Sequence, residues 1–348
     1  MLGSATATTI SSGPTESFIL YVGRLNQVAV VEVDPRTIGG LDSVTKLRVG
    51  YHTRRGVMFA GTIESFLQSR KAIAYEGKIQ LVFTSPPFPL NRKKRYGNKS
   101  GNEYLDWLSG LAAKLVKFLT DDGSIVIEMG NAWEPRRPVM STLTIRALLA
   151  FLEGGELNLC QQFVCYNKAR LPTPAQWVNL DRSRVKDAFT HVWWMAKADK
   201  PKASNRSVLV EYSPSMRELL DTGDYNDGPR PSGHKIGERS FLRDNGGAIP
   251  SNVLEFTNTS SSDVYREFCR DNDLSIHPAR MPAGLAEFFV KMLTDKEDLV
   301  LDPFAGSNTT GAVAESLERR WLAVEPILDY VDGSRGRFSR VRPGTILS

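Results

Sequence analysis

The stretch 79–88 constrains the fold of this chain most strongly. An apolar run over residues 79–83 closes on the motif Thr84-Ser85-Pro86-Pro87-Phe88. Two consecutive prolines fix φ near about −65° and remove two backbone donors, so a buried strand has to end here in a rigid turn that keeps free carbonyl acceptors. Such a turn can hold an amino group, with Ser85 as a further acceptor and Phe88 as a flat apolar surface. Taken alone, the motif favours a simpler interpretation, a strand that is ended by proline and binds nothing.

The segments around this motif alternate between strand-like and helix-like patterns. Apolar residues recur at helical spacing over 103–119, and short β-branched runs lie before and after that segment. Strand, helix and strand joined by short turns are typical of a parallel sheet, so the sequence predicts an α/β fold. We expect strands at 57–61, 79–83, 124–129, 159–166, 192–196, 298–302 and 321–325, helices at 62–74, 103–119, 145–151, 285–293 and from 311 to about 320, and a hairpin at 18–33.

Composition and charge exclude several classes of protein. The chain has 348 residues with 44 basic and 39 acidic side chains, a net charge of +5 that permits a polyanionic partner without requiring one. The basic run Arg92-Lys93-Lys94-Arg95 after the proline turn could contact phosphates, or it could be a solvated loop. Neither a signal segment nor a membrane-spanning run is present, which predicts a cytoplasmic protein with no membrane partner. Three cysteines and four scattered histidines predict neither a disulfide framework nor a metal site.

A second turn, at 302–311, lies in a strand–turn–helix–strand unit, the usual place for a nucleotide at a helix N-terminus. Gly306 and Gly311 have the spacing of a Walker loop, but Ala312 stands where that loop requires lysine. Asn308 replaces the second glycine of a dinucleotide fingerprint. What remains is a nucleoside ligand without phosphates, whose ribose hydroxyls Glu325 could accept; an ordinary tight turn is the alternative.

With both turns in view, the sequence resembles the β-class amino-methyltransferases of DNA, and more specifically the PvuII-type N4-cytosine modification methyltransferases. Residues 84–88 are similar to the catalytic Ser-Pro-Pro form of that family, and residues 302–307 to its cofactor motif. The catalytic motif precedes the cofactor motif, which is typical of the circularly permuted class. The resemblance covers about residues 50–332 and implies a Rossmann-like, S-adenosylmethionine-dependent methyltransferase sheet with an inserted target-recognition region.

The resemblance also implies a role for each motif residue. Ser85 and the Pro86 carbonyl, on the turn that Pro87 completes, would accept hydrogen bonds from the cytosine amino group, and Phe88 would stack on the flipped base. The cofactor would be held by Asp302, Phe304, Ala305, Gly306, Ser307, Asn308 and Glu325, with Pro278 and Arg280 at its methionine end. Double-stranded DNA would be contacted by Arg92, Lys93, Lys94, Arg95, Arg230, His234 and Lys235.

The expected organisation is an extension at 1–49, a catalytic half at 50–196, a target-recognition region at 197–276, a cofactor-binding half at 277–332 and a tail at 333–348. Such an enzyme would act alone or beside a cognate restriction endonuclease. Two other functions remain open: N6-adenine methylation, and DNA binding by an inactive methyltransferase fold. The sequence also departs from the family where an acid often precedes the first helix: it has Gly61-Thr62, and Glu64 is the nearest substitute.

Overall fold

The structure is a computed structural model that divides into residues 1–42 and residues 43–348. It describes residues 46–87, 101–134, 136–224, 228–229, 231–233, 235–236, 242–257 and 263–344, all of them in the second unit. The expected hairpin at 18–33 and the basic run at 92–95 lie outside the described residues. Among the described residues, no helix combines the length and the apolar character needed to cross a bilayer.

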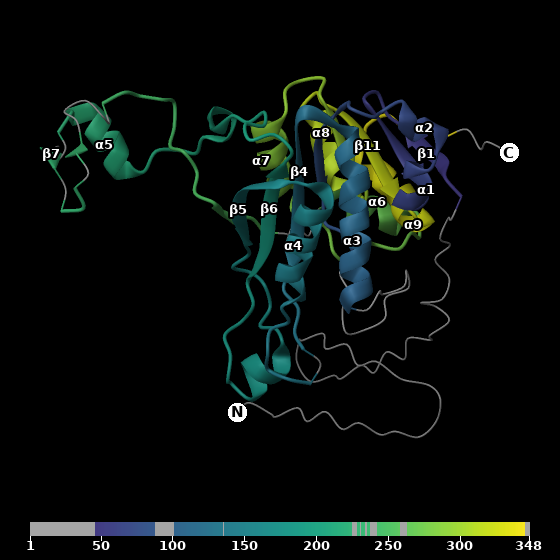
Figure 1. Ribbon diagram of the computed structural model, residues 1–348, viewed down its shortest axis with the longest axis horizontal. Helices are drawn as coiled ribbons and strands as arrows, with labels where there is room; N and C mark the ends of the chain where they lie inside the picture. The colour runs from purple at the N-terminus through teal and green to yellow at the C-terminus, as the bar shows by residue number, and fades with distance from the viewer. Residues whose placement is uncertain are drawn as a thin grey trace. The chain divides into compact units, whose positions relative to one another are not determined.

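One large sheet organises the described part of the chain (Figure 1). Its strands, in spatial order, are β12 (Arg342–Pro343), β1 (Arg48–His52), β2 (Gly56–Ala60), β11 (Arg320–Glu325), β10 (Leu299–Asp302), β3 (Ile79–Thr84), β4 (Leu119–Gly130), β6 (Phe189–Ala196), β5 (Asn158–Tyr166) and β9 (Val253–Glu255). The five strands from β2 to β4 run parallel to one another. Every residue of β3 and β10 is buried, as expected for parallel strands covered on both faces. The predicted α/β fold is confirmed.

Helices cover both faces of this sheet. One face packs against α1 (Ile63–Leu67), α2 (Arg70–Ile73), α3 (Gly101–Leu115) and α4 (Leu143–Gly155), and the other against α7 (Ala283–Leu293), α8 (Thr309–Ser316) and α9 (Leu328–Ser334). In α3 the buried residues recur every three or four positions, so the leucine pattern in the sequence identified the face that packs on the sheet. Because the central strands are parallel, their carboxyl ends all lie at the same edge of the sheet, between the two layers of helices.

Several predicted elements differ in their bounds from those observed; for example, the helix expected to run to about 320 ends at Ser316. The helix expected at 62–74 begins at the predicted N-cap, Thr62, whose side chain accepts a hydrogen bond from the Ser65 amide. It is divided into α1 and α2 at Ser69, because that hydroxyl donates to the Phe66 carbonyl and accepts from the Ala72 amide. A serine that satisfies backbone groups in this way competes with continuous helix. Strand β4 also begins five residues before the expected start at 124.

The segment 197–276 is distributed over three places. Residues 205–208 form a short helix that packs against α7, β9 joins the edge of the main sheet beside β5, and α6 (Val264–Asp271) packs against α9. Between them, α5 (Pro214–Thr222) has no buried residue and lies away from the sheet (Figure 1). The hairpin strands β7 (Gly228–Pro229) and β8 (Lys235–Ile236) follow it. The boundaries of a recognition region at 197 and 276 stay a prediction.

Candidate functional site

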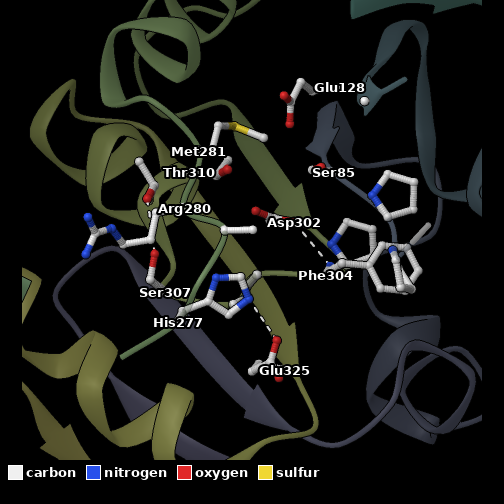
Figure 2. A pocket seen from close by; sticks show the side chains of 18 of the residues that line it. Ser85, Glu128, His277, Arg280, Met281, Asp302, Phe304, Ser307, Thr310 and Glu325 are labelled. Carbon is white, nitrogen blue, oxygen red and sulfur yellow. Dashed lines mark hydrogen bonds between the residues drawn. The ribbon is translucent and has the colours of Figure 1, made fainter. Parts of the chain in front are cut away.

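The two turns singled out in the sequence meet at the edge of the sheet. Strands β3 and β10 are parallel neighbours, so the proline turn after Thr84 and the small-residue turn after Asp302 leave the sheet side by side. The Thr84 hydroxyl donates a 2.7 Å hydrogen bond to the Asp302 carboxylate, and both residues are buried. A cavity of about 630 Å³ opens between the turns (Figure 2).

Most of the predicted site residues line this cavity. From the catalytic motif these are Ser85, Pro86 and Pro87, and from the cofactor motif and its surroundings Pro278, Arg280, Asp302, Phe304, Ala305, Gly306, Ser307 and Glu325. Phe88, the basic run 92–95, Arg230 and His234 lie outside the described residues, and only the backbone of Lys235 is described. The roles given to all these residues stay predictions.

Asp302 connects the two turns. Besides the Thr84 hydroxyl, its carboxylate accepts a 3.1 Å hydrogen bond from the Phe304 amide. Burial disfavours the charged form and raises the pKa of Asp302 to about 6, while these hydrogen bonds oppose the shift. The carboxylate that the sequence placed at the mouth of the turn therefore fixes the geometry of both turns.

Glu325 ends β11, the strand next to β10. Its two carboxylate oxygens accept hydrogen bonds of 2.9 Å from the Gly306 and Ile327 amides, which hold the side chain at the cavity wall. Burial raises the pKa of Glu325 to about 7, and the two amide donors oppose that shift. Each carboxylate oxygen has a second lone pair, so Glu325 can still accept hydrogen bonds from a diol.

Glycine is required at position 306. Its φ is +50°, and a Cβ atom there would lie 2.9 Å from Nε2 of His277, whose ring packs over the turn. The His277 ring in turn meets Tyr330 edge-on at 4.7 Å between centroids. A flat surface and a glycine turn thus border the same part of the cavity.

Asn308 has a structural role. Its side chain accepts a 3.1 Å hydrogen bond from the Gly311 amide, which caps α8, and donates a 3.0 Å hydrogen bond to the Tyr51 hydroxyl. The residue is fully buried and is not among those that line the cavity. Its positive φ of 53° explains why asparagine can replace glycine in this turn.

Two arginines face one aspartate beside the Ser307 end of the cavity. Arg280 and Arg337 approach the Asp263 carboxylate at 3.7 and 3.6 Å. Nε of Arg337 also donates a 2.6 Å hydrogen bond to the Ser307 carbonyl. Arg280 also lines the cavity, so this end of the cavity has a cation that an anionic group of a ligand could approach.

Sequence reasoning missed several of the residues that line the cavity, among them Trp107, Glu128 and Asn131. The ring centroids of Trp107, in α3, and Phe304 lie 5.7 Å apart, and the indole N–H of Trp107 donates a hydrogen bond to the Glu64 carboxylate. Glu128 and Asn131 lie at the end of β4, and Glu128 points into the cavity on the side of Ser85 (Figure 2). The rule that ligands bind at the carboxyl ends of parallel strands could have identified Glu128. No periodic signal identifies Trp107.

Three comparisons place this geometry among known proteins. The family model described as "DNA methylase", for N6 and N4 methyltransferases, matches residues 79–335. The chain is 42% identical over 290 residues to the Type II methyltransferase M.PvuII of Proteus hauseri, covering 83% of this chain and 85% of that protein. The structure of the cytosine-N4-specific PvuII DNA methyltransferase superposes with a TM-score of 0.66 at 35% identity, covering 86% and 90% of the two chains. TTHA0409 of Thermus thermophilus, complexed with S-adenosyl-L-methionine, shares the fold with a TM-score of 0.50 at 20% identity, covering 83% of this chain and 95% of that one.

Proposed function

We propose that this chain, which belongs to the family of N6 and N4 DNA methylases, transfers a methyl group from S-adenosylmethionine to the N4 amino group of a cytosine in double-stranded DNA. The observation that carries the proposal is the Thr84–Asp302 hydrogen bond, which joins an acceptor-rich proline turn to a nucleoside-type turn around one cavity. The identity to a cytosine-N4-specific enzyme and the neutral Ser85 in the catalytic motif favour cytosine over adenine.

The cavity residues fit S-adenosylmethionine. Glu325 would accept the ribose hydroxyls, the Phe304 and Tyr330 rings would border the adenine, and Arg280 would lie at the methionine end of the cofactor. No lysine follows the turn to hold a triphosphate. When bound, S-adenosylmethionine supplies a methyl group carried on a sulfonium sulfur.

The proline turn would position the target nitrogen. A base in a duplex has to leave the stack, at a cost of a few kcal/mol, before its amino group can reach the cavity. Ser85 and the Pro86 carbonyl would then accept the two amino hydrogens, which concentrates electron density on nitrogen as its new bond to carbon forms. This is catalysis by positioning and by electrostatic stabilisation.

The amino nitrogen must lose one proton in the reaction. Among the described residues, four carboxylates line the cavity: Glu64, Glu128, Asp302 and Glu325. Asp302 and Glu325 accept hydrogen bonds from a threonine and from backbone amides, and Glu64 accepts one from an indole. Glu128 accepts no side-chain hydrogen bond from a described residue and points into the cavity beside Ser85, so it is the candidate acceptor of that proton (Figure 2).

Mass spectrometry of nucleosides from DNA of cells that express the chain tests the proposal. We expect N4-methylcytosine, and its loss by about 10²- to 10³-fold in Ser85→Ala, because one acceptor of the transition state is removed. Ser207→Ala, an exposed serine outside the cavity, serves as the matched control. N6-methyladenine as the sole product would overturn the cytosine assignment. Binding of cofactor and DNA without any methyl transfer would identify an inactive methyltransferase fold.

Two further parts of the proposal concern the cell. We propose that the chain works in the cytoplasm, where bacterial DNA lies, and beside a cognate restriction endonuclease, because the relatives in the comparison are named as Type II methyltransferases. Single-molecule sequencing of the modified DNA would give the recognition sequence. An endonuclease that cuts this sequence only when it is unmodified, encoded in the same genome, would support the pairing.

A further inference from the structure

Two loops beside the cavity form one lobe, which we call the 131–188 lobe. It consists of residues 131–140, after β4, and residues 167–188, between β5 and β6. Both loops begin at the cavity wall, since Asn131, Asn167 and Arg170 line the cavity. In Figure 1 the lobe is the teal part with a short helix that projects beyond the ends of β4, β5 and β6. This helix is Gln176–Leu180.

Aromatic and hydrogen-bonded contacts hold the two loops together. The centroids of the Trp133 and Trp177 rings lie 6.2 Å apart, and Cζ of Arg184 lies 4.0 Å from the centroid of the Trp133 ring. Asn131 joins both loops to β6, because its amide donates a 2.8 Å hydrogen bond to Asp187 and its oxygen lies 2.9 Å from Nε2 of His191. The lobe therefore has a defined shape and can hold its surface residues in place.

The surface of the lobe carries cations and exposed aliphatic side chains together. Seven basic residues stand against three acidic ones in the two loops. Arg136, Arg137 and Arg182 are exposed, and their side chains contact no carboxylate of the described residues. Leu171, Leu180 and Val185 are exposed to 77%, 72% and 87%. Three large aliphatic side chains that stay in water do not stabilise the fold, and exposed apolar groups of this kind are typical of a surface that binds another molecule.

We infer that the 131–188 lobe contacts duplex DNA next to the base that enters the cavity, with its arginines on phosphates and its aliphatic side chains against base edges in a groove. The inference rests on the proposed function. Positive charge complements the phosphate backbone, while exposed apolar side chains match thymine methyl groups or a partly unstacked base step. The attachment of the lobe to the cavity wall places these contacts beside the extruded base.

The first test measures how the affinity for a random-sequence duplex depends on salt. Each lost phosphate contact reduces the slope of log K against log salt by about 0.9, so Arg136→Gln/Arg137→Gln/Arg182→Gln is expected to reduce it by about 2 to 3. The matched control is Arg70→Gln/Lys114→Gln/Lys117→Gln, three exposed cations near the amino ends of β3 and β4, which should leave the slope unchanged. Affinity for S-adenosylmethionine should stay unchanged in both variants and shows that they are folded.

The second test identifies the partner of the exposed aliphatic groups. A photo-crosslinking residue, p-benzoylphenylalanine, replaces Leu180 in the full chain, and the control places it at Ile73, which is 64% exposed on α2. We expect crosslinks to DNA from position 180 and not from position 73. An unchanged salt slope, no crosslink from position 180, or a crosslink to a second copy of the chain would each overturn the inference. Neither readout depends on methyl transfer, so failure of the proposed function would be seen separately, as missing methylated base.

Discussion

The Thr84–Asp302 hydrogen bond makes a measurable prediction about stability. Thr84→Val removes the hydroxyl donor at nearly constant side-chain volume, while Asp302 remains buried. At pH 8 the carboxylate is ionised, because burial raises its pKa only to about 6, and the loss of a hydrogen bond to a charged group costs about 1.5–3 kcal/mol. At pH 5 the carboxyl is mostly protonated in the folded protein, and the loss should fall to about 1 kcal/mol.

The sign of the pH dependence follows from proton linkage. The pKa of Asp302 is raised in the folded state, so as the pH falls through 6 the folded protein takes up a proton that the unfolded chain, with a carboxyl pKa of about 4, does not bind. The buried, ionised Asp302 carboxylate therefore destabilises the folded protein at pH values above its pKa, and lowering the pH removes this destabilisation. Without the Thr84 donor the folded pKa rises further, by about one unit for each 1.4 kcal/mol of lost preference for the ionised form.

Urea unfolding of wild type and Thr84→Val at pH 5 and pH 8 measures both quantities. Thr144→Val is the matched control, since that buried hydroxyl donates 3.1 Å to the neutral Gly130 carbonyl and its loss should not depend on pH. Equal losses for Thr84→Val at the two pH values, or a loss under about 0.5 kcal/mol at pH 8, would refute the argument that this bond supports a buried charge.

Two other predictions concern the cofactor end of the cavity. Gly306→Ala should lower the free energy of unfolding by about 1–3 kcal/mol and weaken S-adenosylmethionine binding, because φ is +50° and the added Cβ meets His277. Calorimetry measures the stability and ligand titration measures the affinity. An unaltered free energy of unfolding would contradict the argument that an alanine is strained at this position. Adenosine, which has no group titrating between pH 6 and 8, should bind up to about tenfold more weakly at pH 6 than at pH 8, because the pKa of Glu325 is about 7 and an ionised carboxylate accepts hydroxyls better. Glu325→Gln should remove this pH dependence, and a pH profile that survives the substitution would exclude Glu325 as the ribose acceptor.

Local sequence patterns were sufficient to predict most of the strands, the buried helix faces and the two turns. Strand β3 is buried throughout, and Pro86 and Pro87 follow shortly after its end, so the local pattern predicts both the strand and its termination. The same holds for β10 and the glycine turn after it, where Gly306 takes a conformation that other residues avoid. The burial of a strand, its termination by proline and the need for glycine in a turn depend on neighbouring residues in the sequence, so local patterns predict them.

Which distant residues meet could be learned only from the folded chain. Thr84 and Asp302 are 218 positions apart, and no local pattern pairs them; their hydrogen bond exists because β3 and β10 are neighbours in the sheet. Asn308 is a cap whose amide is satisfied by Tyr51, a partner 257 residues away. The 131–188 lobe depends in the same way on the tilted ring contact between Trp133 and Trp177, which the sequence presents only as two separate aromatic residues in polar loops. Burial and pairing of this kind set the pKa values of Asp302 and Glu325, because the free energy of a charge depends on everything packed around it.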